Sequence, residues 1–250
     1  MTDCIIQTKH LTIGYGAKVL LKEADFAVQK GDIFIIMGGS GCGKSSLLKV
    51  LTGLIPPLKG SFELLSVDFN HASDEKKTLL RQKTGILYQS GALFSSMTLA
   101  ENVAMPLNQY SSYSPSTIDE LVHLKLSLVG LGGYENYYPS EISGGMKKRA
   151  GLARALALDP QIVYFDEPSA GLDPVSSARL DDLMLEINAN LGTTLVVVTH
   201  ELQSIFNIGT NSIYLDAATK TITGQGNPKE LLKNPPNERI AQFLTRGKEK

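Results

Sequence analysis

A glycine-rich stretch that ends in lysine and serine is the part of this sequence best suited to bind an anion. It fits the pattern G-x-x-x-x-G-K-[ST] of phosphate-binding loops. Its glycines let successive backbone N–H groups point at phosphate oxygens, while Lys44 supplies a positive charge and Ser45 a hydroxyl for Mg²⁺. We expect nucleotide phosphates to bind along the stretch, which comprises Gly38, Gly39, Ser40, Gly41, Cys42, Gly43, Lys44, Ser45 and Ser46.

The segments on either side of this loop supply the context that the motif requires. The apolar run 33–37 predicts a buried strand, and residues 46–52 predict a helix that Gly53 ends. The start of a helix adds free amides and the positive end of its dipole. The alternative is a turn that only joins a strand to a helix, but it would leave Lys44 and Ser45 unexplained. The loop therefore predicts binding of a nucleoside triphosphate.

Two acidic residues follow a second apolar run. Residues 162–165 predict a strand, and Asp166 and Glu167 come at its end. Such a strand places its last side chains at the carboxyl edge of a sheet, where ligands bind in α/β folds. We expect Asp166 to hold Mg²⁺ and Glu167 to orient and polarise the attacking water. An acidic strand end is common by itself, and its pairing with the phosphate loop favours the functional interpretation.

A third motif, Ser143-Gly144-Gly145, stands at the head of a predicted helix. An ordinary helix cap would explain Ser143 but not two following glycines, since glycine is a poor helix former. The free amides and the hydroxyl suit an anion. Together with Arg149 and the run 152–156 in helical register, this motif closely resembles the signature of ABC transporter ATPases.

Further residues match landmarks of the ABC family in the same order along the chain. Gln89 resembles the glutamine of the Q-loop, residues 169–174 resemble the D-loop, and His200 resembles the switch histidine. Tyr15 lies where the family keeps an aromatic residue that stacks on adenine. The resemblance covers roughly residues 3–245.

The resemblance implies a mechanism that uses two copies of the chain. In ABC ATPases, ATP lies between the phosphate loop of one copy and the Ser-Gly-Gly of the other. The resemblance therefore assigns phosphate to residues 38–46 and the γ-phosphate of the opposite copy to residues 143–145. It makes Glu167 the general base and His200 the residue that aligns γ-phosphate and water. The residues around Mg²⁺ would be Ser45, Gln89 and Asp166.

The segment after Gln89 narrows the resemblance. Residues 89–94 read Gln-Ser-Gly-Ala-Leu-Phe, as in the ATPases of Mla/Mce-type lipid transporters, and residues 97–107, Met146 and residues 242–244 are also similar. The resemblance implies ATP-driven transport of lipid, in particular phospholipid. It implies a second copy, a transmembrane permease, an Mce-domain lipid-binding protein and a STAS-like protein as partners. The chain would lie on the cytoplasmic face of the inner membrane, held there by the permease.

Other functions that use the same loop remain as alternatives. An ABC ATPase could serve another cargo, such as amino acids or lipoproteins. Soluble ABC ATPases without a permease usually have two fused cores or long coiled coils, whereas this sequence has one core and no sustained heptads. A GTPase or small-molecule kinase is disfavoured because the guanine-reading Asn-Lys-x-Asp is absent and Ser-Gly-Gly would have no role.

The bulk composition is that of a globular protein with one large domain. The chain has 250 residues, 42% of them hydrophobic and 20% charged, and its net charge of −1 with no basic tract does not suggest a nucleic-acid partner. Of the two cysteines, Cys42 lies inside the phosphate loop, which argues for a reducing, cytoplasmic setting. We see no signal peptide and no apolar run of the ~18 residues that a membrane helix needs.

The pattern of predicted elements is that of an α/β protein. Residues 1–250 are expected to form a single ABC ATPase domain, with a catalytic core in 1–90 and 160–250 and a helical lobe in 91–159. The resemblance implies a P-loop NTPase fold with a RecA-like core, an antiparallel β subdomain and an inserted α-helical subdomain. Strands are expected at 3–13, 19–29, 33–37, 61–65, 84–88, 162–165, 194–199, 212–216 and 221–223. Helices are expected at 46–52, 74–82, 99–105, 116–129, 144–158, 174–190, 202–207, 228–233 and 238–245, with a frayed tail at 246–250.

Overall fold

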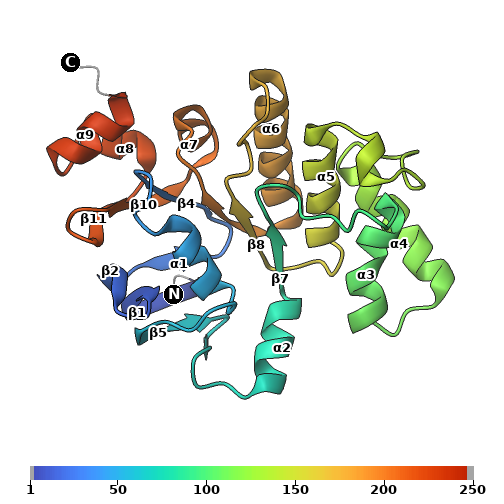
Figure 1. Cartoon of the computed structure of the whole chain (residues 1–250), viewed down its shortest axis with the longest axis horizontal. Coiled ribbons are helices and arrows are strands. Elements are labelled where there is room, and N and C mark those ends of the chain that lie inside the picture. The colour runs from blue at the N-terminus through green and yellow to red at the C-terminus, as the bar shows by residue number, and fades with distance from the viewer. Residues whose placement is uncertain (1–2, 247–250) are drawn as a thin grey trace.

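Two β-sheets organise the protein, seen in a computed structural model that describes residues 3–246 (Figure 1). The larger sheet has the strand order β11-β10-β4-β9-β8-β7, and the smaller has the order β2-β1-β5-β6, with β3 also paired to β1. The larger sheet consists of β4 (Ile33–Gly38), β7 (Thr84–Leu87), β8 (Ile162–Asp166), β9 (Thr194–Val198), β10 (Asn211–Asp216) and β11 (Thr221–Gln225). The smaller sheet consists of β1 (Cys4–Tyr15), β2 (Lys18–Ala24), β3 (Ala27–Gln29), β5 (Lys59–Leu64) and β6 (Val67–Asp68).

Helices cover both faces of the larger sheet. Five of its strands, β4 and β7 to β10, pair in parallel, whereas β11 is antiparallel to β10. The helices are α1 (Lys44–Leu51), α2 (Asp74–Gln82), α3 (Leu99–Tyr110), α4 (Pro115–Leu128), α5 (Gly144–Ala155), α6 (Pro174–Leu191), α7 (Leu202–Ile208), α8 (Pro228–Lys233) and α9 (Glu238–Thr245), with a 3₁₀ turn at Pro139–Glu141. None of the helices within residues 3–246 has the length and apolar character to cross a membrane.

The central strands are apolar throughout because both of their faces are buried. All six residues of β4 are buried, and so are all five of β9. Alternate residues of β4 enter different hydrophobic cores, since successive side chains point to opposite faces. Ile33, Ile35 and Met37 join the core under α3 to α6, whereas Phe34 and Ile36 join the core shared with α1 and the smaller sheet. This strand therefore anchors the loop that follows it from both sides.

Between β7 and β8 the chain forms helices only, which lie on the right of Figure 1. Side-chain caps start the three α-helices of this segment: Thr98 and Glu101 form a capping box at α3, and Ser114 and Ser143 cap α4 and α5. Their apolar faces, including Leu107 of α3, are continuous with one core of the larger sheet. The helices are thus packed against the sheet that carries the phosphate loop.

Two predicted helix boundaries in this region are wrong. We expected the helix that begins at residue 99 to stop before Pro106, but α3 continues through Pro106 to Tyr110. Proline removes only one backbone donor, and the buried faces of Val103 and Leu107 continue on both sides of it. The helix that begins at residue 144 ends at Ala155 rather than at 158, and Asp159 then has a positive φ of 48°.

The predicted strand 19–29 is also broken in the structure. It forms β2 and β3, which pair with different parts of β1. Glu23 has a φ of 49°, and the Thr8 hydroxyl donates to the carbonyl of Ala24 at 2.9 Å and accepts from the amide of Phe26 at 2.9 Å. The side chain of Thr8 thus replaces ladder hydrogen bonds at the break. Of the tail for which we expected fraying, residues 247–250 lie outside the described part of the chain.

Candidate nucleotide-binding site

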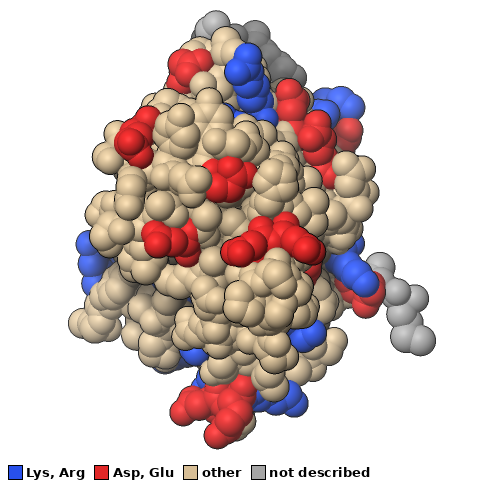
Figure 2. Space-filling view, turned by 90° about the vertical axis from the view of Figure 1, so that its right-hand side faces the viewer, with Lys and Arg blue, Asp and Glu red and all other residues tan. Residues whose placement is uncertain are grey.

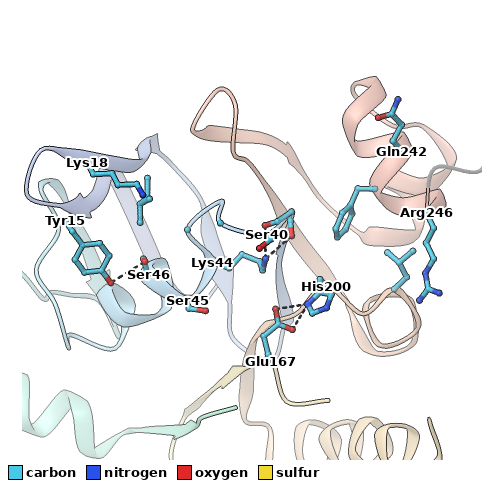
Figure 3. Close-up of a pocket in the computed structure, with 17 residues that line it drawn as sticks. Tyr15, Lys18, Ser40, Lys44, Ser45, Ser46, Glu167, His200, Gln242 and Arg246 are labelled. Atoms are coloured by element: carbon cyan, nitrogen blue, oxygen red, sulfur yellow. Dashed lines mark hydrogen bonds and ion pairs between the residues drawn. The ribbon is translucent and has the colours of Figure 1, made fainter. Parts of the chain in front are cut away.

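A cavity of about 910 Å³ opens where β4 passes into α1 (Figure 3). It combines residues from the two ends of the chain and from the middle. Its lining comprises Tyr15, Lys18, Leu20, Gly38, Gly39, Ser40, Gly41, Gly43, Lys44, Ser45, Ser46, Glu167, His200, Leu202, Gln242, Phe243 and Arg246. All of the predicted phosphate loop except Cys42 therefore faces one space.

The loop between β4 and α1 leaves the amides at the start of the helix free. The N-cap of α1 is Gly43, which has a φ of 102° and offers no side chain to cap the helix. The first helical hydrogen bond runs from Leu47 N to Gly43 O, so the amides of the three preceding residues have no partner in the helix. A side chain at Gly38 would also collide with the backbone, because its Cβ would lie 2.5 Å from the Leu215 carbonyl oxygen. The loop thus forms an anion cradle in which glycine is needed at two positions.

The ammonium of Lys44 lies across the loop. Its Nζ donates to the carbonyl of Gly38 at 2.9 Å and to that of Gly39 at 3.1 Å. Figure 3 shows the side chain pointing into the cavity between Ser40 and the Glu167–His200 pair. A phosphate group in the cradle would compete with these carbonyl oxygens for the ammonium, and its negative charge makes it the stronger acceptor.

Ser45 and Asp166 meet where α1 begins and β8 ends. The Ser45 hydroxyl donates to Asp166 Oδ1 at 2.9 Å. Hydroxyl and carboxylate oxygens are ligands that Mg²⁺ accepts, so the pair fits the predicted magnesium site. Within residues 3–246 no cluster of three or more His, Cys, Asp or Glu could hold a metal. A magnesium ion here would have Ser45 and Asp166 as its nearest protein oxygens and would take further ligands from the phosphates and water.

Gln89, the third residue expected at the magnesium site, lies in the turn after β7. Its side chain is exposed, and it is not among the residues that line the cavity. The structure thus brings Ser45 and Asp166 together, and of the three residues expected around magnesium only Ser45 lines the cavity itself.

Glu167 and His200 form a pair at the ends of neighbouring parallel strands. His200 Nδ1 lies 2.9 Å from both Oε1 and Oε2 of Glu167. Because both neighbours are carboxylate oxygens, Nδ1 must carry the hydrogen. It bonds to Oε1, and the buried Oε2 has no hydrogen bond of its own. The Glu167 side chain is 14% exposed and that of His200 is 56% exposed. A largely buried carboxylate thus faces the cavity beside a partly exposed imidazole.

The backbone of Glu167 is held in an unfavourable conformation. Its φ is 49°, in the left-handed region that costs a residue with a side chain about 1–2 kcal/mol. Its amide donates to the carbonyl of Val198 at 2.9 Å, which fixes the chain as it leaves β8. Strain of this kind persists only where the surroundings enforce it, and it gathers at functional sites.

Tyr15 provides an aromatic face at the far side of the cavity. It is 49% exposed at the end of β1, and its Oη lies 3.4 Å from Ser46 Oγ. Lys18 and Leu20 of β2 line the same side. An exposed ring beside a phosphate cradle can stack on a base.

The sequence did not predict that the C-terminal helices would line the cavity. Leu202 lies on α7, Gln242 and Phe243 lie on α9, and Arg246 follows directly. Phe243 packs edge-on against Tyr214 with 5.2 Å between ring centroids. The resemblance noted at residues 242–244 was the only sequence signal for this contact.

The Ser-Gly-Gly motif lies elsewhere on the molecule. Ser143 caps α5 by accepting from the Met146 amide at 3.3 Å, and both Ser143 and Gly144 are exposed. Ser143 and Gly145 border a different hollow, of about 590 Å³, between α5 and α6. In Figure 1, α5 and α1 lie on different sides of β8. A single chain therefore does not bring this motif to the phosphate cradle.

Cys42 is the one member of the loop that points away from the cavity. Its side chain is buried in the core shared with α1. Burial raises the pKa of its thiol, and the charge of Lys44 opposes that effect. Its backbone amide donates within the loop, to Gly39 O at 3.5 Å. Cys42 thus shapes the loop from behind.

Comparison with known proteins identifies the family. Residues 21–170 match the family described as "ABC transporter". The chain is 41% identical to the "Probable ribonucleotide transport ATP-binding protein mkl" of Mycobacterium leprae, covering 96% of this chain and 68% of that protein. It is 37% identical to the "Intermembrane phospholipid transport system ATP-binding protein MlaF" of Haemophilus influenzae, covering 98% of this chain and 91% of the relative.

Solved structures agree with the fold. The cbiO1 protein of Clostridium perfringens, described as part of the ABC transporter complex cbiONQ, superimposes with a TM-score of 0.85 at 26% identity over 98% of this chain and 97% of that one. The ATP-binding cassette MJ0796, solved as a dimer in a post-hydrolysis state with ADP and Pi, superimposes with a TM-score of 0.80 at 28% identity, over 89% of this chain and 98% of that one. The expected fold class is confirmed, and the chain belongs to the ABC transporter family as an ATP-binding subunit that hydrolyses ATP.

Proposed function

We propose that this chain drives phospholipid transport, acting as the ATPase of an inner-membrane transporter. The observation that carries the cargo assignment is the 37% identity to the H. influenzae phospholipid ATPase over almost the full length of both chains. The segment 89–94, whose sequence suggested a lipid transporter, supports the same assignment. The other parts of the proposal follow from the geometry of the cavity.

In this proposal the phosphate cradle binds ATP by exchanging partners. The free amides at the start of α1 receive the phosphate oxygens. Lys44 leaves the carbonyls of Gly38 and Gly39 and moves to the β- and γ-phosphates. Tyr15 stacks on the adenine at the open side of the cavity. The loop need not change its fold, because its left-handed glycines already hold it open.

Hydrolysis would depend on the Glu167–His200 pair. Glu167 accepts a proton from the attacking water, because its carboxylate lines the cavity beside the phosphate cradle. His200 leaves Glu167 as the γ-phosphate arrives and donates to a phosphate oxygen, which aligns phosphate and water. Ser45 and Asp166 would hold Mg²⁺, with Gln89 moving in from its exposed turn. The ion would neutralise charge on the phosphates.

We propose that a second copy completes each site. Ser143, Gly144 and Gly145 stand at the free N-terminus of α5 and would receive the γ-phosphate bound to the opposite copy. The exposure of Ser143 and Gly144, and the absence of all three residues from the lining of the cavity in one chain, support this arrangement. Release of the γ-phosphate would remove the contact and let the two copies separate.

The helices between β7 and β8 provide a surface for the permease. We treat residues 91–159 as a lobe on the catalytic core formed by 1–90 and 160–250. A groove along α3, bordered by Met97, Ala104 and Met105, has a volume of about 690 Å³. Figure 2 shows the face of this lobe as mostly uncharged, with scattered acidic groups. Exposed aromatic residues on the lobe add to its apolar surface, and they are Phe94, Tyr110, Tyr113, Tyr134, Tyr137 and Tyr138.

The further partners are those of a lipid transporter. An Mce-domain protein would carry the lipid, and a STAS-like protein would bind the ATPase. The chain would be held peripherally at the cytoplasmic face of the inner membrane through its permease. Ribonucleotides are a second candidate cargo, because the mycobacterial relative with 41% identity carries that description and this chain spans about two thirds of it.

Purification of the full chain from membranes tests this proposal. We expect a multi-span permease and an Mce-domain protein to co-purify with it. ATP hydrolysis by the complex in phospholipid vesicles should exceed that in detergent. Recovery with a solute-binding protein instead, or stimulation by ribonucleotides and not by phospholipid, would overturn the lipid assignment.

A matched pair of variants tests the docking surface. Met105→Arg places a charge in the groove of α3, whereas Lys229→Ala changes an exposed residue of α8. We expect the first to lose the permease and the second to retain it, with equal ATP affinity in both. Retention of the permease by Met105→Arg would exclude this groove as the docking site.

A further inference from the structure

A buried lysine on α5 contacts the loop that follows the catalytic glutamate. Lys148 is 5% exposed. Its Nζ donates to the carbonyl of Pro168 at 2.5 Å and to that of Ala170 at 2.5 Å. Within residues 3–246 it has no carboxylate oxygen within 4.0 Å. This ammonium is therefore held by two backbone carbonyls, an arrangement different from an ordinary ion pair.

Burying an ammonium group costs free energy unless hydrogen bonds or nearby charges compensate for its lost hydration. Burial lowers the pKa of the Lys148 ammonium, and the negative charge of Glu167 acts in the opposite direction. An uncharged side chain of the same length would fill this space without the desolvation. The burial of this cation is therefore not explained by packing. It is explained by its hydrogen bonds to the two carbonyls and by the nearby charge of Glu167.

The loop that receives this ammonium starts at the strained Glu167. Only a few hydrogen bonds fix the turn, including one from the Ala170 amide to the Glu167 carbonyl at 3.2 Å. Pro168 has no amide to donate. Because Lys148 donates to two carbonyls of the turn at once, it restricts the backbone dihedral angles of the residues that follow Glu167. The orientation of the Glu167 carboxylate therefore depends on a side chain from another helix.

The same helix carries the Ser-Gly-Gly motif at its N-terminus. Ser143 caps α5, and Lys148 follows little more than one turn later. On the proposed function, the N-terminus of α5 serves the ATP bound to the opposite copy, whereas Glu167 serves the ATP bound to its own chain. Helix α5 thus connects the Ser-Gly-Gly motif, which serves one ATP site, to the Glu167 turn, which serves the other.

We propose that Lys148 is a positioning residue that orients Glu167 and ties it to α5. ATP contact at the N-terminus of α5 in one site then sets the carboxylate in the other, which couples the two sites of the dimer. This inference rests on the proposed function of Glu167 and of the Ser-Gly-Gly motif. It predicts an effect on turnover and on cooperativity rather than on ATP binding.

Lys148→Met in the full chain is the direct test. It retains the apolar stem and removes the charge and the donors. We expect kcat for ATP hydrolysis to fall about 10- to 100-fold, the scale of a misplaced catalytic group. The Kd for ATP should stay within about threefold, and the Hill coefficient for ATP should fall towards one.

A second buried lysine gives a matched control. Lys125 on α4 is also 5% exposed, and its ammonium is paired with Asp159, away from the cavity. Lys125→Met removes the same groups at the same burial. If it changes kcat and cooperativity as much as Lys148→Met does, loss of a buried cation rather than positioning explains the effect and the inference fails. Lys148→Gln keeps a neutral donor, and its kcat for ATP hydrolysis should lie between that of Lys148→Met and that of the native chain. It replaces Lys148→Met in the test if that variant does not fold.

A double-mutant cycle separates this inference from the proposed function. If Lys148 acts through Glu167, then Lys148→Met should change the residual rate of the Glu167→Gln chain by less than about twofold. If the rate loss in the double variant were the product of the losses in the two single variants, the inference would be overturned, while Glu167 would remain the base. Full activity in Glu167→Gln itself would instead overturn the proposed function.

Discussion

The phosphate cradle and the Ser-Gly-Gly motif are both helix N-termini, yet they differ in what surrounds them. Around the cradle, the charged side chains already have partners: the Lys44 ammonium donates to two backbone carbonyls of the loop, and the Glu167 carboxylate is paired with His200. The N-terminus of α5 has only its own cap at Ser143 and is exposed. The first region thus contains charge and a base, and the second contains amides without a catalytic group. The difference is what we expect if the two regions are complementary halves of one site, as proposed above for two copies of the chain.

Glu167→Gln should have the largest effect on the cradle side. We expect hydrolysis to slow by ~10²–10⁴, the scale of losing a general base, while ATP still binds. The chain should then accumulate as an ATP-bound dimer, which size-exclusion chromatography with light scattering would detect. Near-normal turnover would remove Glu167 from the role of base.

Ser143→Arg tests the other side. A bulky charged side chain at the head of α5 should block the approach of the second copy and slow hydrolysis by about 10²–10³, as loss of transition-state donors does. ATP binding to the monomer should be unchanged in a fluorescence titration. Ser114→Arg, at the cap of α4, is the control for the loss of a cap. Equal losses of activity in both variants would remove the distinction between the two helix ends.

Lys44→Ala should instead weaken binding itself. Hydrogen bonds to charged groups contribute about 1.5–3 kcal/mol each, so the Kd for ATP should rise about 10- to 100-fold. Calorimetric titration of the full chain measures this directly. A variant that binds ATP normally but turns it over slowly would place Lys44 with the catalytic groups rather than the binding groups.

Tyr15→Ala should have the smallest effect. An aromatic stacking contact is worth about 0.5–1.5 kcal/mol, which corresponds to roughly a two- to tenfold loss of ATP affinity. Tyr15→Phe keeps the ring and should bind as the native chain does, because the contact of the hydroxyl with Ser46 is long, at 3.4 Å, and exposed. If Tyr15→Phe binds ATP as weakly as Tyr15→Ala does, the hydroxyl rather than the ring provides the interaction with ATP.

The sequence predicted the strands and the loop of the cradle well because local physics fixes them. An apolar run such as Ile33–Met37 is long enough for a strand and too short for a buried helix. Predictions failed where contacts from far along the chain decide the outcome. The core beneath Leu107 lets α3 continue past Pro106, and the hydroxyl of Thr8 breaks the strand 19–29.

The residues of the candidate site also fall into those that the local sequence predicted and those that only long-range packing positions. The pattern of residues 38–46 predicted the cradle, and the acidic end of β8 predicted a partner for Ser45. Lys148 had no such signal, because it stands among other basic residues at the start of α5 and only the fold turns it inward. The contribution of α9 to the cavity likewise arises from packing between the two ends of the chain. Gln89 remains a prediction, since it lies outside the cavity in a single chain.

Mixing two inactive variants tests the central claim, that each site is built from two copies. A dimer of one Lys44→Ala chain and one Ser143→Arg chain has both defects in one site and an intact cradle facing an intact Ser-Gly-Gly in the other. With random pairing, half of the dimers are of this kind and each has one working site. At an ATP concentration near the native Kd, where Lys44→Ala binds little ATP and each variant alone is nearly inactive, two independent sites would recover about a quarter of native ATP hydrolysis in a 1:1 mixture. We predict a recovery above that of either variant alone and below this quarter, because the defective site also leaves Glu167 of the working site without its contact through α5. A mixture no more active than its components would contradict the claim.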